Sequence, residues 1–181
     1  MTESQKMLLS AKKEELRRKM SLNETRNIVK INLPSFSLIE IYGDKEVEFA
    51  YFKEKWSDFY KAQRAGELDI KISPTGKCDQ YYCDWVLSEI PEINDFDEWI
   101  ITNMRGDYKY FAKIKAGDKF DSIKELWHMD KSITNKNTGY VDGIFAINAT
   151  IKKFISVGCF LGPWDLGFHP EYNYQLEVHS F

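Results

Sequence analysis

Apolar and polar residues alternate in several stretches of the chain, and this alternation predicts extended strands. Residues 29–33 alternate three apolar side chains with two polar ones and precede Pro34, so we expect a strand that ends at the proline. A second extended run is expected at 36–42. The stretch 94–104, NDFDEWIITNM, is typical of a turn that leads into a strand, and 143–160 is typical of two strands joined near residues 148–150.

The longest alternation lies at the C-terminal end. Four apolar residues alternate there with polar ones, which predicts a strand with one apolar and one wet face: Tyr172, Tyr174, Leu176 and Val178. Chain ends usually fray unless something holds them. We therefore expect this strand to be paired, either within the domain or with a neighbouring subunit.

Three other stretches have helical spacing. Residues 3–20 are rich in Lys, Arg and Glu, and predict either a solvated helix or an arm that docks on a neighbour. A helix over 45–65 should begin after Asp44 and end at Gly66. It carries an aromatic stripe that we expect to be buried: Phe49, Phe52, Trp56 and Phe59. A shorter helix is expected within 119–129, with one apolar face formed by Phe120, Ile123, Leu126 and Trp127.

The order of these elements predicts an α+β domain built on an antiparallel sheet with flanking helices. We expect an N-terminal helical arm over 1–22 and a single domain over 23–181, with a helical insertion around 44–92. The chain has 181 residues, of which 43% are hydrophobic and 15% aromatic, and this composition is typical of a folded domain with a sizeable core.

Charge and composition exclude several classes of function. The formal net charge of −3 offers no basic footprint for specific binding of nucleic acid. No apolar run approaches the roughly 18 residues of a membrane span, and the N-terminal residues lack the apolar core of a signal peptide. With three cysteines and no export signal, we expect reduced thiols rather than a disulfide framework.

One group of residues suggests metal chemistry. His128 and Asp130, with His169 or His179 downstream, could form the two-histidine, one-carboxylate triad of a non-haem iron oxygenase. The alternative is the ordinary end of an amphipathic helix. Oxygenases that use a 2-oxo acid usually place a basic residue after the last histidine, and here the last basic residue is Lys153. We therefore favour the structural interpretation.

Other candidate sites are weaker. Cys78 and Cys83 lack a nearby second ligand pair for zinc, and Cys159 is expected to be a small core residue of a strand. An acidic cluster lacks the ligand spacing of a calcium loop and is expected to form a solvated turn: Glu92, Asp95, Asp97 and Glu98. No phosphate-binding glycine loop and no G-x-S-x-G motif occurs. We therefore expect neither enzymatic activity nor a cofactor.

Three stretches together resemble the tail-tube proteins of contractile-tailed, T4-like bacteriophages and the related tube-initiating baseplate proteins. INLPSF at 31–36 resembles a strand that closes on a Leu-Pro kink. DFDEWIITNM at 95–104 is similar to the family's acidic and Trp-containing lead into a strand. FISVGCFLGPWDLGF at 154–168 resembles the family's near-terminal Gly, aromatic and Pro before a last strand. Pro163 lies about two residues later than in the family, and a basic helix stands where an early strand is expected.

The resemblance implies a sandwich or barrel-like tube domain that assembles as a hexameric ring around a DNA-conducting channel. It implies a virion protein of the tail or baseplate, assembled in the host cytoplasm. Its partners would be copies of itself and other tail or baseplate proteins, and DNA would pass without specific binding. The candidate subunit-contact or structural residues are Phe96, Asp97, Trp99, Trp164, Tyr172, Tyr174, Leu176 and Val178. A small intracellular binding protein, of the immunity or regulatory kind, remains an alternative.

Overall fold

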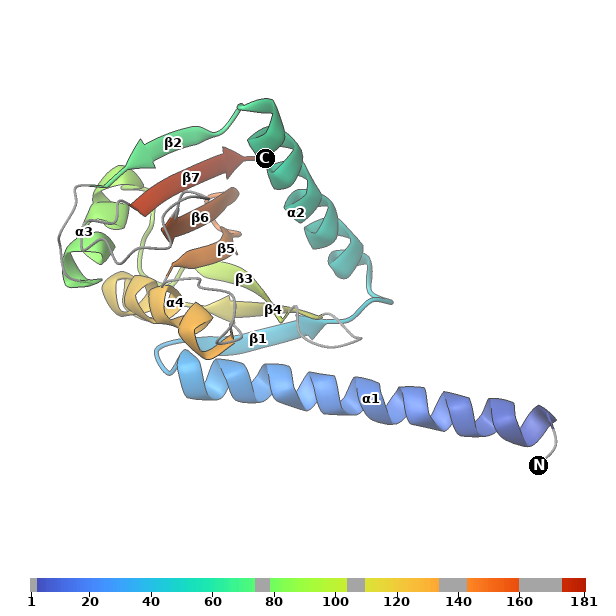
Figure 1. Cartoon of the computed structure of the whole chain (residues 1–181). Helices are drawn as coiled ribbons and strands as arrows, with labels where there is room; N and C mark the ends of the chain where they lie inside the picture. Colours follow the sequence, from blue (N-terminus) through green and yellow to red (C-terminus); the bar gives the residue numbers. More distant parts are fainter. Residues whose placement is uncertain (1–2, 74–78, 104–109, 134–142, 160–173) are drawn as a thin grey trace, which may run out of the picture.

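The computed structural model describes residues 3–73, 79–103, 110–133, 143–159 and 174–181. Helices and strands follow one another along these residues as shown in Figure 1. Their bounds are α1 Glu3–Asn32, β1 Ser37–Tyr42, α2 Val47–Ala65, β2 Asp69–Ile72, α3 Asp79–Glu89, β3 Glu98–Asn103, β4 Tyr110–Lys115, α4 Lys119–Ile133, β5 Ile144–Asn148, β6 Lys153–Cys159 and β7 Tyr174–Ser180.

The strands form one seven-stranded sheet in the order β1-β4-β3-β5-β6-β7-β2. Every neighbouring pair is antiparallel. β1 and β2 are the edges, although both belong to the first half of the chain, and β7 lies between β6 and β2. The α+β class, the antiparallel sheet, the flanking helices and the N-terminal helix are therefore confirmed.

Helices cover both faces of the sheet. The C-terminal half of α1 lies with α3 and α4 on one face, which we call the α4 face, and α2 lies alone on the other, the α2 face (Figure 1). Because side chains alternate along a strand, each central strand supplies both cores. In β3, Trp99 and Ile101 belong to the α4 face, whereas Ile100 belongs to the α2 face.

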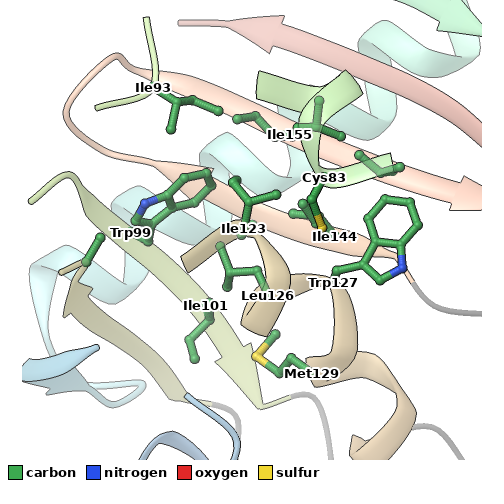
Figure 2. Close-up of a cluster of buried hydrophobic side chains, with 14 of the residues drawn as sticks. Cys83, Ile93, Trp99, Ile101, Ile123, Leu126, Trp127, Met129, Ile144 and Ile155 are labelled. Atoms are coloured by element: carbon green, nitrogen blue, oxygen red, sulfur yellow. The ribbon is translucent and has the colours of Figure 1, made fainter. Parts of the chain in front are cut away.

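The core of the α4 face contains large aliphatic and aromatic side chains from the sheet and three helices. Figure 2 shows Trp99 and Trp127 on opposite sides of Ile123 and Leu126. All four side chains are buried. The predicted apolar face of α4 is therefore confirmed, and its fourth member, Phe120, packs half-buried at the rim.

The core of the α2 face is mainly aromatic. Phe52, Trp56 and Phe59 are buried against the sheet, and Phe49 packs half-buried beside them, so the predicted stripe is confirmed. Phe59 stacks on Phe154 with ring centroids 4.1 Å apart. Gly66 ends the helix in the left-handed conformation, with φ of 71°, where glycine carries no steric penalty.

The strand predicted at 29–33 is wrong, because these residues continue and end α1. Inward-facing residues recur every fourth position from Ser21 through Thr25 and Val29, and Leu33 follows directly after the helix. This is helical spacing, and it extends well beyond the five-residue alternation. The helix start at Asp44 is also wrong: the N-cap is Glu46, and Asp44 instead pairs with Arg18.

The terminal strand has the predicted apolar face, but its polar side is partly covered. Tyr174 and Leu176 point into the core of the α4 face. On the opposite side Glu177 is only 4% exposed, because α2 covers it. Its carboxylate accepts hydrogen bonds from Gln63 of α2 at 2.8 Å and from Gln175 at 2.7 Å. Burial of this carboxylate is therefore compensated by polar contacts.

The stretch expected as a helical insertion, 44–92, contains α2, β2 and α3. β2 is an edge of the sheet and α3 contributes to the core of the α4 face. α1 runs without a break through residue 22, the expected end of the arm. The segment 44–92 and the C-terminal half of α1 are thus built into the same layers as the rest of the domain.

Candidate functional site

α1 consists of two halves with different surroundings. Every residue from Glu3 to Arg17 is exposed, whereas Ser21, Thr25 and Val29 are buried against the body. Figure 1 shows the N-terminal half extending well past the sheet. We call residues 3–17 the arm. Its exposed large apolar residues, with those of the next turn, are Met7, Leu8, Leu9, Leu16 and Met20.

The attachment of the arm to the body is polar. The guanidinium of Arg18 lies 3.4 Å from the Asp44 carboxylate and 3.2 Å from that of Glu14. The hydroxyl of Tyr110, at the start of β4, donates to the backbone carbonyl of Arg18 at 3.1 Å. The contacts with Asp44 and Tyr110 hold the helix at the point where it leaves the body, and the pair with Glu14 lies within the helix.

The helix and the rest of the chain carry opposite charges. Residues 1–32 hold eight basic and four acidic residues, a formal charge of +4. Of the 25 basic and 28 acidic residues in the chain, 17 and 24 therefore belong to 33–181, which gives −7. The small overall net charge thus hides a basic helix on an acidic body.

The two edges of the sheet expose apolar side chains. Leu38 and Ile39 are exposed on β1, and Ile70 and Ile72 are exposed on β2. An irregularity of register between Leu38 and Glu40 interrupts β1. Such a bulge, and the short length of β2, are features that limit edge-to-edge pairing.

The turn before β3 is held by a buried carboxylate. Asp97 accepts hydrogen bonds from the backbone N–H of Asn94 at 3.1 Å and from the side-chain amide of Asn148 at 2.8 Å. Trp99 lies fully buried beneath it. The expectation that Asp97 holds this turn is therefore confirmed, whereas the burial of Trp99 is equally expected of an ordinary core residue.

Phe96, in the same turn, has an unusual backbone conformation and an exposed side chain. Its φ is 64°, in the left-handed region that a bulky side chain rarely adopts, and its side chain is 66% exposed. Its N–H donates to the carbonyl of Gly117 at 3.0 Å. The Nζ of Lys115 lies 5.9 Å from the ring centre. A rigid turn thus presents an aromatic ring to solvent.

A groove of about 520 Å³ opens between one side of α2 and the sheet. Its sheet wall contains Thr102 of β3 and Phe111 of β4. Its helix wall contains residues from four turns of α2, namely Phe49, Lys53, Trp56, Ser57, Tyr60, Gln63 and Arg64. The groove therefore combines an aromatic floor with a polar and basic rim.

The charges on the α2 face are unevenly distributed. Among the described residues, neither Lys53 nor Arg64 at the groove forms an ion pair, and Arg64 donates only to the carbonyl of Tyr60. Farther along, Tyr42 is buried near several carboxylates. Burial, and then the charges led by Glu40, raise the pKa of the Tyr42 hydroxyl to about 12. The groove is thus the basic part of this face.

The residues predicted for metal chemistry are only partly described. His128 is half-buried on α4, and His179 is half-buried on β7. The side chain of Asp130, and His169 altogether, lie outside the described residues. No group of three or more metal-ligating side chains occurs within the part of the chain that the structure describes. The oxygenase alternative stays untested.

The cysteines do not form a described cluster either. Cys83 is buried in the core of the α4 face. Cys159 ends β6, as the expected strand position requires, and its side chain is not described. Cys78 lies outside the described residues. The acidic residues around Glu92 serve local contacts, since Glu92 pairs with Lys153 at 2.6 Å, and this contact lowers the pKa of its carboxyl.

The predicted contact residues of the terminal strand are located as follows. Tyr174 and Leu176 are buried in the core, and Val178 packs half-buried beside them. Trp164 and Tyr172 lie outside the described residues. Backbone hydrogen bonds tie β7 to β6 on one side and β2 on the other. Its backbone is therefore already paired within the chain.

The groove was not predicted from the sequence. A signal was present beside the aromatic stripe of α2, where Lys53, Ser57, Tyr60 and Arg64 recur at three- and four-residue spacing. They form a second stripe along the helix. The stripe can be interpreted as the wall of a groove only when the position of the sheet beside the helix is known.

Comparisons with known proteins do not assign the chain to a family. No protein family, no curated protein and no solved structure matches the chain. Among the described helices, none has both the length and the apolar character that crossing a membrane requires. Any functional assignment therefore depends on the surfaces described above and on the sequence resemblance.

Proposed function

We propose that the protein is a structural subunit that assembles with copies of itself, and that the assembly is a ring of a phage tail or baseplate tube. The observation that carries this proposal is the arm of α1, an exposed helical segment with uncovered apolar side chains that projects from an acidic body. The arm is suited to a neighbouring copy rather than to its own body.

The stability of the arm supports this proposal. An isolated helix of about 15 residues is marginal in water. In this arm, apolar side chains are exposed and lie on several sides of the helix, so its own surface gives it little support. Docking on another molecule would bury these side chains and stabilise the helix.

Charge favours a second copy as the partner. The arm, residues 3–17, carries four basic and three acidic residues, a formal charge of +1, and the rest of the chain carries −4, so the arm of one molecule and the body of another have opposite charges. Because the arm points away from its own body, such a contact joins two different surfaces. Contacts of this head-to-tail kind produce closed rings or open filaments.

The assignment to a tail tube rests on the sequence resemblance. Of its three stretches, 95–104 leads into β3 and 154–168 begins on β6. Residues 160–168, with the Gly, aromatic and Pro of the third stretch, lie outside the described residues. The first stretch, 31–36, does not form the expected strand, because it spans the end of α1. The hexameric ring, the DNA channel and the tail or baseplate partners follow from the resemblance alone.

Measurement of mass and shape tests the proposal. We expect the full chain to form rings, seen by native mass spectrometry and negative-stain microscopy, and a variant that lacks residues 1–17 to lose them while its body stays folded by circular dichroism. Lys12→Glu with Lys13→Glu should weaken assembly, and raised salt should do the same. The matched control, Lys12→Arg with Lys13→Arg, keeps the charge and should assemble normally.

Two outcomes would contradict the proposal. A full chain that stays monomeric at every accessible concentration would exclude self-assembly. A tight one-to-one complex with an unrelated protein, formed by the monomer, would favour the small binding protein instead.

A further inference from the structure

We propose that the turn bearing Phe96 in one copy docks into the α2 groove of the next copy. This contact rests on the proposed self-assembly and names a pair of surfaces for it. It is separate from the contact of the arm, because both surfaces belong to the body.

The first observation is the way in which Phe96 is presented. Its side chain is mostly exposed and its φ is 64°, where Gly or Asn would be less strained. The turn is rigid, since Asp97 and the Gly117 carbonyl hold its backbone. An exposed and strained aromatic residue adds nothing evident to the fold of a single chain. A rigid turn also loses little conformational freedom on binding.

The second observation is the size and lining of the groove. A volume of about 520 Å³ is ample for one phenyl ring and the backbone beside it. Tyr60 is exposed at the rim and offers an aromatic surface for an edge or stacked contact with such a ring, and the buried rings of Trp56 and Phe111 line the floor beneath it. Buried aromatic anchors of this kind dominate the energetics of protein interfaces.

The third observation is charge complementarity. The segment 92–98, EINDFDE, has four carboxylates and no basic residue. Asp97 is buried, and Glu92 and Glu98 pair with Lys153 and Lys113, so the charge available to a partner is that of Asp95. The groove carries Lys53 and Arg64, which have no ion-pair partner among the described residues. Asp95 is the exposed acid next to Phe96 in sequence. The charges of turn and groove therefore orient the two surfaces toward each other.

The contact has to join two molecules. Phe96 lies just before β3 begins, whereas Thr102, in the wall of the groove, lies near the end of the same strand. Six residues of extended chain separate them by roughly 20 Å. The turn therefore cannot reach the groove of its own chain. Because turn and groove are different surfaces, repetition of the contact links copies head to tail.

Complementary variants test the proposal. Phe96→Ser removes the ring from the turn, and Ser57→Trp fills the groove from an exposed position of α2. Each variant alone should associate at least about tenfold more weakly than the native chain in analytical ultracentrifugation. An equimolar mixture should associate more tightly than either variant alone, because one variant keeps the groove and the other keeps the turn. Glu54→Trp, at an exposed position of α2 that does not line the groove, is the matched control and should associate normally.

The possible outcomes distinguish failure of this contact from failure of the proposed self-assembly. If the native chain assembles and both variants assemble equally well, the docking is wrong and self-assembly stands. If the native chain never associates, self-assembly is wrong and this contact with it. If the anionic aromatic probe 1-anilinonaphthalene-8-sulfonate binds the groove while Ser57→Trp blocks the probe without changing association, the groove is a small-molecule site and the docking is wrong.

Discussion

The two faces of the sheet are covered in different ways. On the α4 face, α3, α4 and the inner half of α1 enclose a core that includes the fully buried Trp99 and Trp127 (Figure 2). On the α2 face a single helix covers aromatic side chains, and a groove remains along one side of it. One helix is too narrow to cover a seven-stranded sheet, since helices pack only about 10 Å apart.

The two faces therefore differ in their roles: the α4 face stabilises the fold, and the rim of the α2 face is available for association. Side chains that are enclosed on all sides contribute most to the stability of the fold, and their removal lowers the free energy of unfolding most. Side chains at the rim of a groove contribute little to the single chain and remain available to a partner. We therefore expect variants on the α4 face to change folding and variants on the rim of the α2 face to change association.

The largest effect is expected from removing the strand that both faces share. Deletion of 174–181 removes an interior strand and exposes the backbone groups of β6 and β2 that β7 pairs with. It also removes Leu176 from one core and Glu177 from the other face. We expect a chain that does not fold, measured by circular dichroism. A truncated chain with native spectra and a cooperative melt would contradict this.

The next largest change in stability is expected when an enclosed side chain is removed, and the comparison is with a side chain at the rim of the groove. Trp127→Ala should lower the free energy of unfolding by about 3–5 kcal/mol, because it leaves a large cavity in the core of the α4 face. Tyr60→Ala, at the rim of the groove, should change it by less than about 0.5 kcal/mol. Urea unfolding measures both. Equal losses would show that the rim is as important for folding as the enclosed core.

A smaller effect, with the opposite sign, is expected at the exposed turn. Phe96→Gly relieves the left-handed backbone and should raise the free energy of unfolding by about 1 kcal/mol. The same variant should weaken association. Lys152→Gly, at another non-glycine position with a positive φ (55°), is the control, and should gain stability without loss of association. Thermal melts and sedimentation measure the two properties. Loss of stability in Phe96→Gly would show that the ring supports the fold itself.

The smallest effect at neutral pH is expected from Tyr42 on the α2 face. Burial raises the pKa of its hydroxyl to about 12 in the folded chain, against roughly 10 when unfolded. The unfolded chain therefore releases this proton first, and stability falls as the pH rises from about 10 to about 12. Tyr42→Phe should behave as the native chain at pH 7 and lose less stability over that range. Identical alkaline losses in the two proteins would refute this.

Part of the fold could be predicted because its signals are local. The aromatic stripe of α2, the apolar face of α4, the strand after the Asp97 turn and the hairpin of β5 and β6 all follow from side-chain spacing within one element. Asp97 was placed correctly for the same reason, since a turn and the strand after it are neighbours in sequence.

Other features depend on contacts between distant segments. Residues 29–33 look like a strand over five positions, and only the packing of Val29 and Leu33 against the core of the α4 face shows that they continue a helix. The polar side of β7 looks wet, and only the position of α2 above it makes Glu177 a buried, hydrogen-bonded group. Side-chain spacing does not record which element will cover a face.

The sequence by itself determined which residues are apolar, which stretches are helical or extended, and that a basic segment precedes an acidic one. The tertiary structure alone decided that β7 lies inside the sheet, that β1 and β2 form its edges, and that one helix leaves a groove on the α2 face. The physical reason is that strand pairing and the covering of a sheet join residues far apart in sequence, whereas spacing patterns report only on neighbours along the chain.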